Sequence, residues 1–400
     1  MNLFFEKNTS IMKLLSYVYY KGKRFSAEEV EDITQVENSE KSYYLFGVYY
    51  YKDINTLINN IKKAKEYFHE IKFNIIIGGF GLYGLDFEEL KKLFPEINYI
   101  ILGKGEKLLS KILDNNLQPG LYLEKEKIEP YNILPSFIKN FKRVEISFDN
   151  SRCVWNRCKF CHHSTIPKSH VNEVKDVFEK IVYNYNIGVR KFYFYDNFLI
   201  FNKFYKLLDL LLENKMTDIN FKIFGVHVKS NYNKLHKYLP KFNNLISDLS
   251  VGYEFLDDKI LRKYDKGITV RDILKFDEYV SKNNIKTNVY LLYGLPGANE
   301  NNINNHFNNL KKINSRFFNT SFFLLNEKIY MFKHLDEFGI KLKRKYTLKD
   351  YMYTMPEIHT YNWDFETDGK SRKEVFEQYK PYMKDDRHKI NYKAGFLNDR

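Results

Sequence analysis

The sequence predicts an α/β protein: a doubly wound, Rossmann-like parallel sheet, then a partial parallel barrel of six βα units, then an irregular C-terminal extension. Two observations predict this fold. Strand and helix patterns alternate along most of the chain, and the strand patterns are almost continuously apolar, which is typical of parallel strands covered on both faces. A stretch with three prolines, Leu117–Pro135, interrupts the alternation once and indicates two separate sheets.

The front domain, residues 1–116, contains three strand patterns, each followed by apolar residues at helical spacing. Glycines stop the second and third strands. The strand patterns are residues 42–51, 73–79 and 97–103, and the helix patterns are residues 54–68, 87–94 and 106–113. This order predicts a parallel sheet with helices on both faces.

Residues 117–140 are expected to be a linker, and residues 141–330 repeat the alternation as six βα units. The expected strands are residues 143–148, 191–196, 221–228, 249–255, 288–294 and 318–325. Such units close fully or partly into a barrel whose site lies at the carboxyl ends of the strands. Residues 331–400 lack the alternation, and we expect this extension to cover a substrate.

Composition supports a folded chain without a membrane anchor. The 400 residues are 44% hydrophobic and suit two domains. The net charge of +14 comes mostly from scattered lysines, which disfavours a continuous basic surface for binding nucleic acid. No apolar run approaches the roughly 20 residues of a membrane helix, and the N-terminus does not resemble a signal peptide. We therefore expect a cytoplasmic protein.

All three cysteines lie on the loop after the first strand of the second sheet. Cys153, Cys158 and Cys161 have the spacing C-x4-C-x2-C. An odd number of clustered cysteines in a reducing compartment indicates metal ligation rather than disulfides. Three thiolates suit an iron–sulfur cluster with one open iron. The same cysteines with His162, His163 or His170 would also suit a tetrahedral zinc ion, and a second cysteine-ligated cluster is excluded.

Further motifs follow in order along the chain. Phe160 precedes the last cysteine, and the segments FYFYDNF (192–198), VGYEFLDDKILRKYDKG (251–267) and YGLPGANE (293–300) end later strands. Together they resemble the radical S-adenosylmethionine (SAM) enzymes that have an N-terminal cobalamin-binding-like domain. The first cysteine gap is one residue longer than the usual C-x3-C-x2-C of that family.

The front domain resembles the family's cobalamin-binding-like domain only in part. Its IIIGGFG and ILGKGE segments are similar to the glycine turns of such domains. The D-x-H-x-x-G motif that supplies the lower ligand of cobalt is absent, and His69 is the only histidine before the cysteines. The sequence thus allows cobalamin but shows no histidine-ligand motif for it.

The resemblance implies a set of cofactor contacts. The three cysteines would hold a [4Fe–4S] cluster, and the open iron would bind SAM. Tyr195, Asp196 and Asn197 would meet the methionyl amine. Lys229 would pair with the carboxylate, and Glu254 with the ribose. The glycine-rich turn of Gly294, Pro296 and Gly297 would approach adenine, and Arg152, His162 and His163 would flank the cluster. No residue acting on the substrate is identified.

The resemblance also implies an activity. The enzyme would cleave SAM and use the 5′-deoxyadenosyl radical to abstract hydrogen from a ribosomally made peptide or another natural-product precursor. The substrate class rests on Phe322–Leu342, which is similar to a segment of peptide-maturing members. A flavodoxin or ferredoxin would supply electrons. The alternatives are a cobalamin-dependent methyltransferase, a tRNA-modifying radical SAM enzyme and a zinc-stabilised RNA-binding protein.

Overall fold

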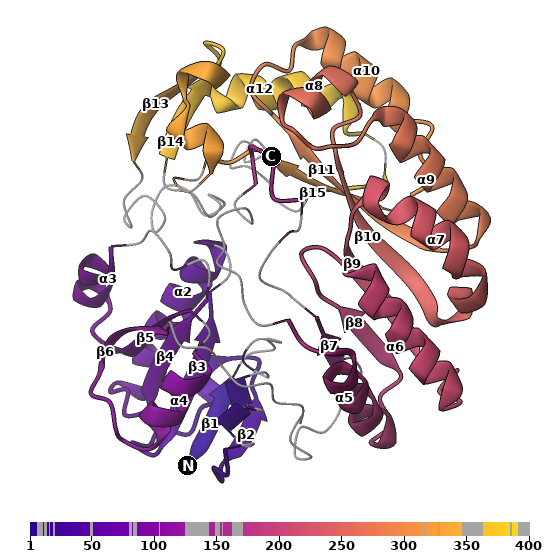
Figure 1. Cartoon of the computed structure of the whole chain (residues 1–400). Coiled ribbons are helices and arrows are strands. Elements are labelled where there is room, and N and C mark those ends of the chain that lie inside the picture. Colours follow the sequence, from indigo (N-terminus) through magenta and orange to yellow (C-terminus); the bar gives the residue numbers. More distant parts are fainter. Residues whose placement is uncertain are drawn as a thin grey trace. The chain divides into compact units, whose positions relative to one another are not determined.

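The computed structural model divides the chain into two compact units, each described here by itself (Figure 1). The described residues up to Glu124 belong to the first, and those from Val144 to Ile390 to the second. The structure describes residues 1–5, 11, 14–15, 17–18, 21–48, 51–79, 82, 86–103, 105–124, 144–148, 153, 155–161, 171–315, 317–325, 327, 329–345, 363–384 and 386–390.

The first unit is built on a six-stranded parallel sheet in the order β2-β1-β3-β4-β5-β6. Its described strands are β1 (Asn2–Phe5), β2 (Ser26–Glu29), β3 (Ser42–Gly47), β4 (Asn74–Gly78), β5 (Ile97–Gly103) and β6 (Gly120–Glu124). Its described helices include η1 (Ile33–Gln35), α2 (Tyr51–Phe68), α3 (Phe87–Leu93) and α4 (Glu106–Leu113). The three predicted strands and the three predicted helices are confirmed.

Alternate residues of β3 show why this sheet is doubly wound. Tyr44 and Phe46 join a buried cluster with α2 on one face, whereas Tyr43 and Leu45 join a second cluster with α4 on the other. Successive side chains of a strand point to opposite faces, so an uninterrupted apolar strand requires helices on both sides. The Rossmann-like sheet predicted from the sequence is therefore confirmed.

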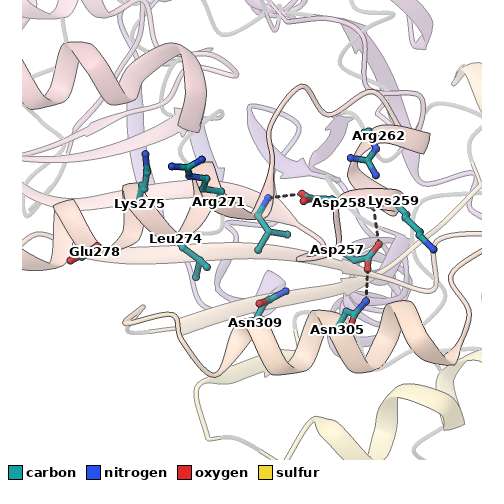
Figure 2. A pocket seen from close by; sticks show the side chains of 11 residues that line it. Asp257, Asp258, Lys259, Arg262, Arg271, Leu274, Lys275, Glu278, Asn305 and Asn309 are labelled. Carbon is teal, nitrogen blue, oxygen red and sulfur yellow. Dashed lines mark hydrogen bonds between the residues drawn. The ribbon is translucent and has the colours of Figure 1, made fainter.

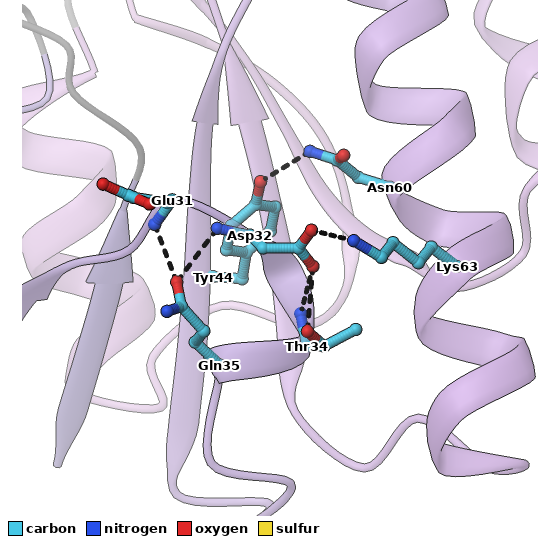
Figure 3. A network of polar contacts seen from close by, with 7 residues as sticks. All are labelled: Glu31, Asp32, Thr34, Gln35, Tyr44, Asn60 and Lys63. Atoms are coloured by element: carbon cyan, nitrogen blue, oxygen red, sulfur yellow. Dashed lines mark hydrogen bonds and ion pairs between the residues drawn. The ribbon is translucent and has the colours of Figure 1, made fainter.

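A polar network ties η1 to the helical layer of this unit (Figure 3). Asp32 caps η1 through the backbone N–H of Thr34 and forms an ion pair with Lys63 of α2. The hydrogen bond from Lys63 lowers the pKa of Asp32. Next to it, Asn60 of α2 donates to the hydroxyl of Tyr44 at 3.1 Å. These contacts fix how α2 lies on β3 and serve the fold.

The segment expected to be a linker begins with a strand. Gly120–Glu124 forms β6, which pairs in parallel with β5 and closes one edge of the first sheet. Sequence analysis missed it because Pro119 and Gly120 read as turn residues. The pairing with β5 outweighs this local signal, since strand formation depends strongly on tertiary context. The remaining residues assigned to the linker, 125–140, lie outside the described part of the chain.

The second unit contains a seven-stranded parallel sheet in the order β15-β12-β11-β10-β9-β8-β7. Six strands are those expected of the partial barrel: β7 (Val144–Ile146), β8 (Lys191–Phe194), β9 (Asn220–Val226), β10 (Ile246–Glu254), β11 (Lys286–Tyr293) and β12 (Phe317–Phe322). The helices between them are α5 (Val174–Asn186), α6 (Phe201–Glu213), α7 (Val228–Phe242), η4 (Asn243–Leu245), α8 (Asp258–Lys263), α9 (Val270–Lys282) and α10 (Glu300–Leu310). Larger helices of this series line one face of the curved sheet (Figure 1).

The C-terminal extension, expected to be irregular, contains short regular elements. Strand β15 joins the sheet beside β12, and β13 pairs antiparallel with β14. The described elements are η5 (Tyr330–Lys333), η6 (Asp336–Phe338), β13 (Ile340–Lys345), β14 (Trp363–Thr367), α12 (Arg372–Tyr379), η7 (Lys380–Tyr382) and β15 (His388–Ile390). Such short elements give almost no periodic signal, so the sequence did not predict them.

No described helix combines the length and the apolar composition that crossing a bilayer requires.

A buried histidine joins the ends of β10 and β11 to α10. The Nδ1 atom of His306 accepts the backbone N–H of Leu256 at 2.8 Å, so the proton of the neutral ring is on Nε2, which faces the Tyr293 hydroxyl at 3.4 Å. The ring also stacks on Phe255, with centroids 4.4 Å apart. Burial, assisted by the positive charge of His388, lowers the pKa of His306 to about 3. The folded protein therefore holds this ring neutral.

Because His306 is held neutral, we predict that the folded protein loses stability in acid. The pKa of this histidine is near 6.5 in the unfolded chain and about 3 in the folded one. The contribution of the neutral His306 ring to the free energy of unfolding is therefore complete above pH 6.5 and decreases as the pH falls toward 3. Between pH 7.5 and 5 the free energy of unfolding should fall by about 2 kcal/mol on this account. The variant His306→Asn, whose side-chain oxygen can replace Nδ1, should lack this part of the pH dependence.

Urea unfolding at the two pH values, followed by tryptophan fluorescence, checks this prediction, since both tryptophans, Trp155 and Trp363, lie in the second unit. The matched control is the variant His236→Asn, which replaces an exposed histidine. An equal pH dependence in His306→Asn and the parent would contradict the prediction.

Candidate active site

The cysteine loop follows β7 at the carboxyl end of the second sheet. Cys158 and Cys161 share a turn, in which the backbone N–H of Cys161 donates to the carbonyl oxygen of Cys158 at 3.1 Å. All three thiols are half-buried, and Cys153 is close enough to act electrostatically on Cys158. Burial raises the pKa of Cys158 to about 11, although the positive charge of Lys266 opposes the rise. The loop thus holds three half-buried thiols, with Cys158 next to the Lys266 cation.

Trp155 anchors this loop to the segment after α8. Its indole Nε1 donates to the carbonyl oxygen of Asp265 at 2.7 Å, and its ring stacks on His227 with centroids 5.5 Å apart. Gly267 has a φ of +74°, and a Cβ there would overlap the indole ring. Glycine is therefore needed at this position both for the backbone angle and for the indole contact.

The longer first cysteine gap contains Asn156, which lies next to this anchor. Asn156 has a φ of +49°, a left-handed conformation that asparagine adopts more readily than most residues. On its far side, Arg157 forms an ion pair with the Asp265 carboxylate, with Nε and Oδ2 3.0 Å apart. Trp155 and Arg157 thus both hold Asp265, and the left-handed backbone of Asn156 lies between them.

The other end of the loop contacts α8 and the C-terminal extension. The backbone N–H of Lys159 donates to the carbonyl oxygen of Tyr264 at 3.2 Å, and the Phe160 ring lies edge-on to Tyr264. The Lys159 ammonium forms an ion pair with Glu337 of η6 at 2.9 Å and lies over the Phe338 ring. The extension therefore contributes directly to the position of the cysteine loop.

A buried ion pair lies beside the thiols. Lys266 Nζ and Glu254 Oε1 are 2.7 Å apart, and the side chains are 11% and 17% exposed. Burial alone would lower the pKa of Lys266, but the negative charges of Glu254, Cys158 and Cys161 raise it well above its ordinary value. A Cβ at Gly252 would overlap the Glu254 carboxylate, so this glycine makes room for the pair. Glu254 itself has a φ of +62° at the end of β10.

Residues at the end of β8 occupy the position expected for SAM contacts, but Asp196 has a structural partner. Its carboxylate accepts the backbone N–H of Phe148 at 3.3 Å and is 3% exposed. It therefore connects the ends of β7 and β8. The Tyr195 side chain is 47% exposed and packs against Phe224, with ring centroids 4.3 Å apart. Asn197 follows at the crossing where Gly225, with a φ of +73°, lets the backbones meet.

The third strand leads to His227 and Lys229. The His227 imidazole lies between Trp155 and Phe198, with centroids 5.5 and 5.6 Å away. Burial, together with the positive charges of Lys266 and Lys229, lowers its pKa to about 4. Lys229 is exposed in the first turn of α7. It thus lies close to the stacked rings, but the structure gives it no partner that would identify a role.

The glycine-rich turn after β11 contacts protein groups on two sides. The carbonyl oxygen of Pro296 accepts from the Tyr264 hydroxyl at 2.6 Å and from Lys263 at 3.1 Å. The backbone N–H of Gly297 donates to Asp368 at 2.6 Å. Gly294 and Gly297 have φ values of +70° and +79°. Between this turn and α12 lies a cavity of about 180 Å³.

Several predicted neighbours of the cluster lie outside the described residues: Arg152, His162, His163 and His170. Among the described residues, no group of three histidine, cysteine or acidic side chains is arranged to hold a single metal ion.

Comparison with known proteins identifies the second unit. Residues 150–310 match the family model of the radical SAM superfamily. The chain carries a radical SAM domain. The cysteine loop, Glu254 and the glycine-rich turn all fall within the matched residues. No curated protein is significantly similar to the chain in sequence.

Solved structures share the fold of both units. The radical SAM methyltransferase TsrM from Kitasatospora setae, with tryptophan and a SAM analogue bound, has a TM-score of 0.61 and 13% identity, covering 89% of this chain and 81% of TsrM. The cobalamin-dependent radical SAM enzyme OxsB, with cobalamin and SAM bound, has a TM-score of 0.55 and 13% identity, covering 94% of this chain and 57% of OxsB. Both are cobalamin-binding radical SAM folds, as the sequence motifs indicated.

Sequence reasoning missed several residues that build the site of this radical SAM domain: Trp155, His227, Lys266 and Asp368. Of these residues, Lys266 could have been identified from the sequence, because it belongs to the "K-G" end of the fourth-strand motif. Trp155 lies in the longer cysteine gap, which was noted without an explanation. His227 and Asp368 had no sequence signal, because their roles come from contacts with residues distant in the chain.

From the contacts of Trp155 we predict that its removal weakens the retention of a reconstituted iron–sulfur cluster. Trp155→Ala removes the hydrogen bond to Asp265 and the stack on His227, so the loop should hold a reconstituted cluster less firmly. We expect lower iron and sulfide content and faster loss of iron to a chelator. Trp363→Ala, the same substitution in β14 of the same unit, should retain iron like the parent. Equal iron loss in Trp155→Ala and the parent would show that the anchor has no such role.

The Glu254–Lys266 pair predicts non-additive destabilisation. Removing one partner of a buried pair leaves the other charge uncompensated and typically costs about 3–5 kcal/mol. Glu254→Gln and Lys266→Met should each lower the free energy of unfolding by roughly 3 kcal/mol, and the double variant by clearly less than their sum. A double-mutant cycle in urea, with ligand-free protein, measures this. Additive effects would mean that the two charges do not interact.

Proposed function

We propose that this radical SAM domain binds a [4Fe–4S] cluster through Cys153, Cys158 and Cys161 and uses it to cleave SAM. The observation that carries the proposal is the placement of all three cysteines on one loop at the carboxyl end of a parallel sheet, with a buried ammonium near Cys158 and Cys161. When bound, the cluster and SAM supply a 5′-deoxyadenosyl radical that abstracts hydrogen from a substrate. The protein positions and shields these groups.

The residues at the site fit such a cluster. Three thiols with no fourth protein ligand on the described loop suit a cluster that leaves one iron open. The Lys266 ammonium favours the deprotonated sulfurs that metal binding requires, since thiolates are the ligands. Glu254, paired with Lys266, is fixed at the strand end where the ribose contact was expected. We assign the cluster to the cysteines and the SAM contacts to Tyr195, Asn197, Glu254 and the turn from Gly294 to Gly297.

Asp196 receives a different assignment from the one expected. Its carboxylate bonds the backbone of Phe148 and is buried. We therefore assign it to positioning the end of β7, where the cysteine loop begins, and leave the methionyl amine to its neighbours.

A second candidate function is methyl transfer with cobalamin. It is favoured by the front unit, because the fold shared with TsrM and OxsB extends over both units. Strands β3, β4 and β5 each end in a glycine (Gly47, Gly78 and Gly103), like the glycine turns expected of a cobalamin-binding-like domain. His69 follows the C-terminus of α2, which returns to the amino edge, so it is unsuited as a ligand there. Cobalamin would bind without a ligand from His69.

For the substrate we propose a natural-product precursor, either a peptide or a small molecule. The segment Phe322–Leu342, which suggested a ribosomal peptide, includes η5 and η6 and contacts the cysteine loop through the Lys159–Glu337 ion pair. A segment at this place can cover a substrate beside the cluster. Reduced thiols also fit the cytoplasmic location expected from the sequence.

Anaerobic reconstitution tests the main proposal. Protein supplied with iron and sulfide should bind about four irons, and with dithionite and SAM it should release 5′-deoxyadenosine. The triple variant Cys153→Ala/Cys158→Ala/Cys161→Ala should do neither, because no cysteine remains to hold the cluster. Stoichiometric zinc without sulfide in the native protein, or no SAM cleavage by protein that holds a cluster, would overturn the proposal.

A separate arm tests the candidate methyltransferase. Titration with hydroxocobalamin should produce a bound spectrum that remains after gel filtration. His69→Ala should leave that spectrum unchanged, which distinguishes binding without this histidine from histidine ligation. Failure to retain cobalamin would eliminate methyl transfer and leave the radical proposal intact.

A further inference from the structure

An open groove lies on the helical layer of the second unit, away from the thiols. Its volume is about 620 Å³, and it runs between α8, α9 and α10 (Figure 2). Val270 and Leu274 provide its apolar part. Its polar lining consists of Asp257, Asp258, Lys259, Arg262, Arg271, Lys275, Glu278, Asn305 and Asn309.

Most of the exposed side chains that line the groove are cationic, whereas its acids are mostly covered or paired within the protein. Lys259, Arg262, Arg271 and Lys275 are exposed, and none has an ion pair with another described residue. In contrast, Asp257 accepts from two backbone N–H groups of α8 and from Asn302 and Asn305. Asp258 accepts the backbone N–H of Val270 at 2.8 Å, and Glu278 pairs with Lys282 at 2.6 Å. Four cations therefore face solvent over a short stretch of surface.

The two asparagine amides that line the groove bond to other protein groups. Asn305 Nδ2 donates inward to Asp257, and Asn309 Nδ2 donates inward to the carbonyl oxygen of Leu256, each at 3.1 Å. Each of these amides thus uses at least one donor within the protein. Small-molecule sites are concave and fix their ligand with convergent polar groups. An apolar centre with a charged rim is the arrangement of a protein interface.

Helix α8 connects this groove to the cysteine loop. It has six residues and is about 9 Å long. Arg262 in its last turn lines the groove, whereas the next residues contact the loop: Tyr264 accepts the backbone N–H of Lys159, and Asp265 accepts the indole N–H of Trp155. A partner bound in the groove would lie one short helix from the thiols.

We propose that this groove docks an acidic one-electron donor protein with a reduced flavin or iron–sulfur group. The inference rests on the proposed function, because each cleavage of SAM consumes one electron and the chain has no further cysteines for a second cluster. The donor loses one electron, and the cluster held by the cysteines gains it. Charge complementarity between the cationic rim and an acidic donor would orient the encounter.

Charge reversal tests the proposal. In the reconstituted protein, Arg262→Glu/Arg271→Glu/Lys275→Glu should weaken the binding of flavodoxin at least about tenfold in calorimetric titration and reduce its salt dependence. SAM cleavage supported by dithionite should stay at the parental rate, since none of these residues contacts the site. The matched control is Lys191→Glu/Lys206→Glu/Lys286→Glu, which makes the same change in net charge at exposed residues of β8, α6 and β11.

The outcomes separate the two proposals. Loss of dithionite-supported cleavage in the parent would reject the proposed function itself. Equal weakening of flavodoxin binding in both variants, no weakening in either, or no binding by the parent would overturn the docking site. Groove-specific loss of RNA binding with unchanged flavodoxin binding would also overturn it, in favour of a nucleic-acid partner. The alanine variant Arg262→Ala/Arg271→Ala/Lys275→Ala, expected to show a smaller loss in the same direction, guards against misfolding caused by charge reversal.

Discussion

The cysteine loop depends on the segment Tyr264–Gly267, which follows α8. This segment offers the loop two backbone carbonyl oxygens, one carboxylate, one ammonium and one glycine surface. The carbonyls of Tyr264 and Asp265 fix Lys159 and Trp155 at the two ends of the described loop. Lys266 then lies beside the thiols as a consequence of the same backbone path. A loop of this length has few internal hydrogen bonds, so its conformation comes from the surface on which it lies.

Close backbone approaches at the strand ends make this arrangement possible. Gly225 allows the ends of β8 and β9 to cross, Gly252 leaves space for the Glu254 carboxylate, and Gly267 accepts the indole ring. At each position an added Cβ would overlap an existing atom. Since the carboxyl ends of parallel strands converge on one edge, the site of such a sheet is crowded with backbone. These glycines therefore determine how near the charged side chains come to the thiols.

Much of the fold could be predicted from the sequence, because apolar strands and amphipathic helices carry a periodic signal. The cysteine loop and the strand-end motifs were recognisable for a similar reason, since ligand chemistry fixes their residue types and spacing. The contact of Asp196 with the backbone of Phe148 was not predictable, because the two residues are forty-eight positions apart in the chain. The same holds for β6 and β15, whose few residues become strands only through their neighbours β5 and β12.

The C-terminal extension shows how short elements that come late in the sequence, such as β15, affect the site. Strand β15 adds a seventh strand beside β12, and Tyr379 of α12 stacks on Tyr293 at the end of β11, with ring centroids 4.9 Å apart. Asp368 then holds Gly297, and Glu337 holds Lys159, so the extension contacts both the glycine-rich turn and the cysteine loop. These are the two segments assigned to SAM and to the cluster. Because one extension contacts both, we expect a change in its position to alter the two segments together.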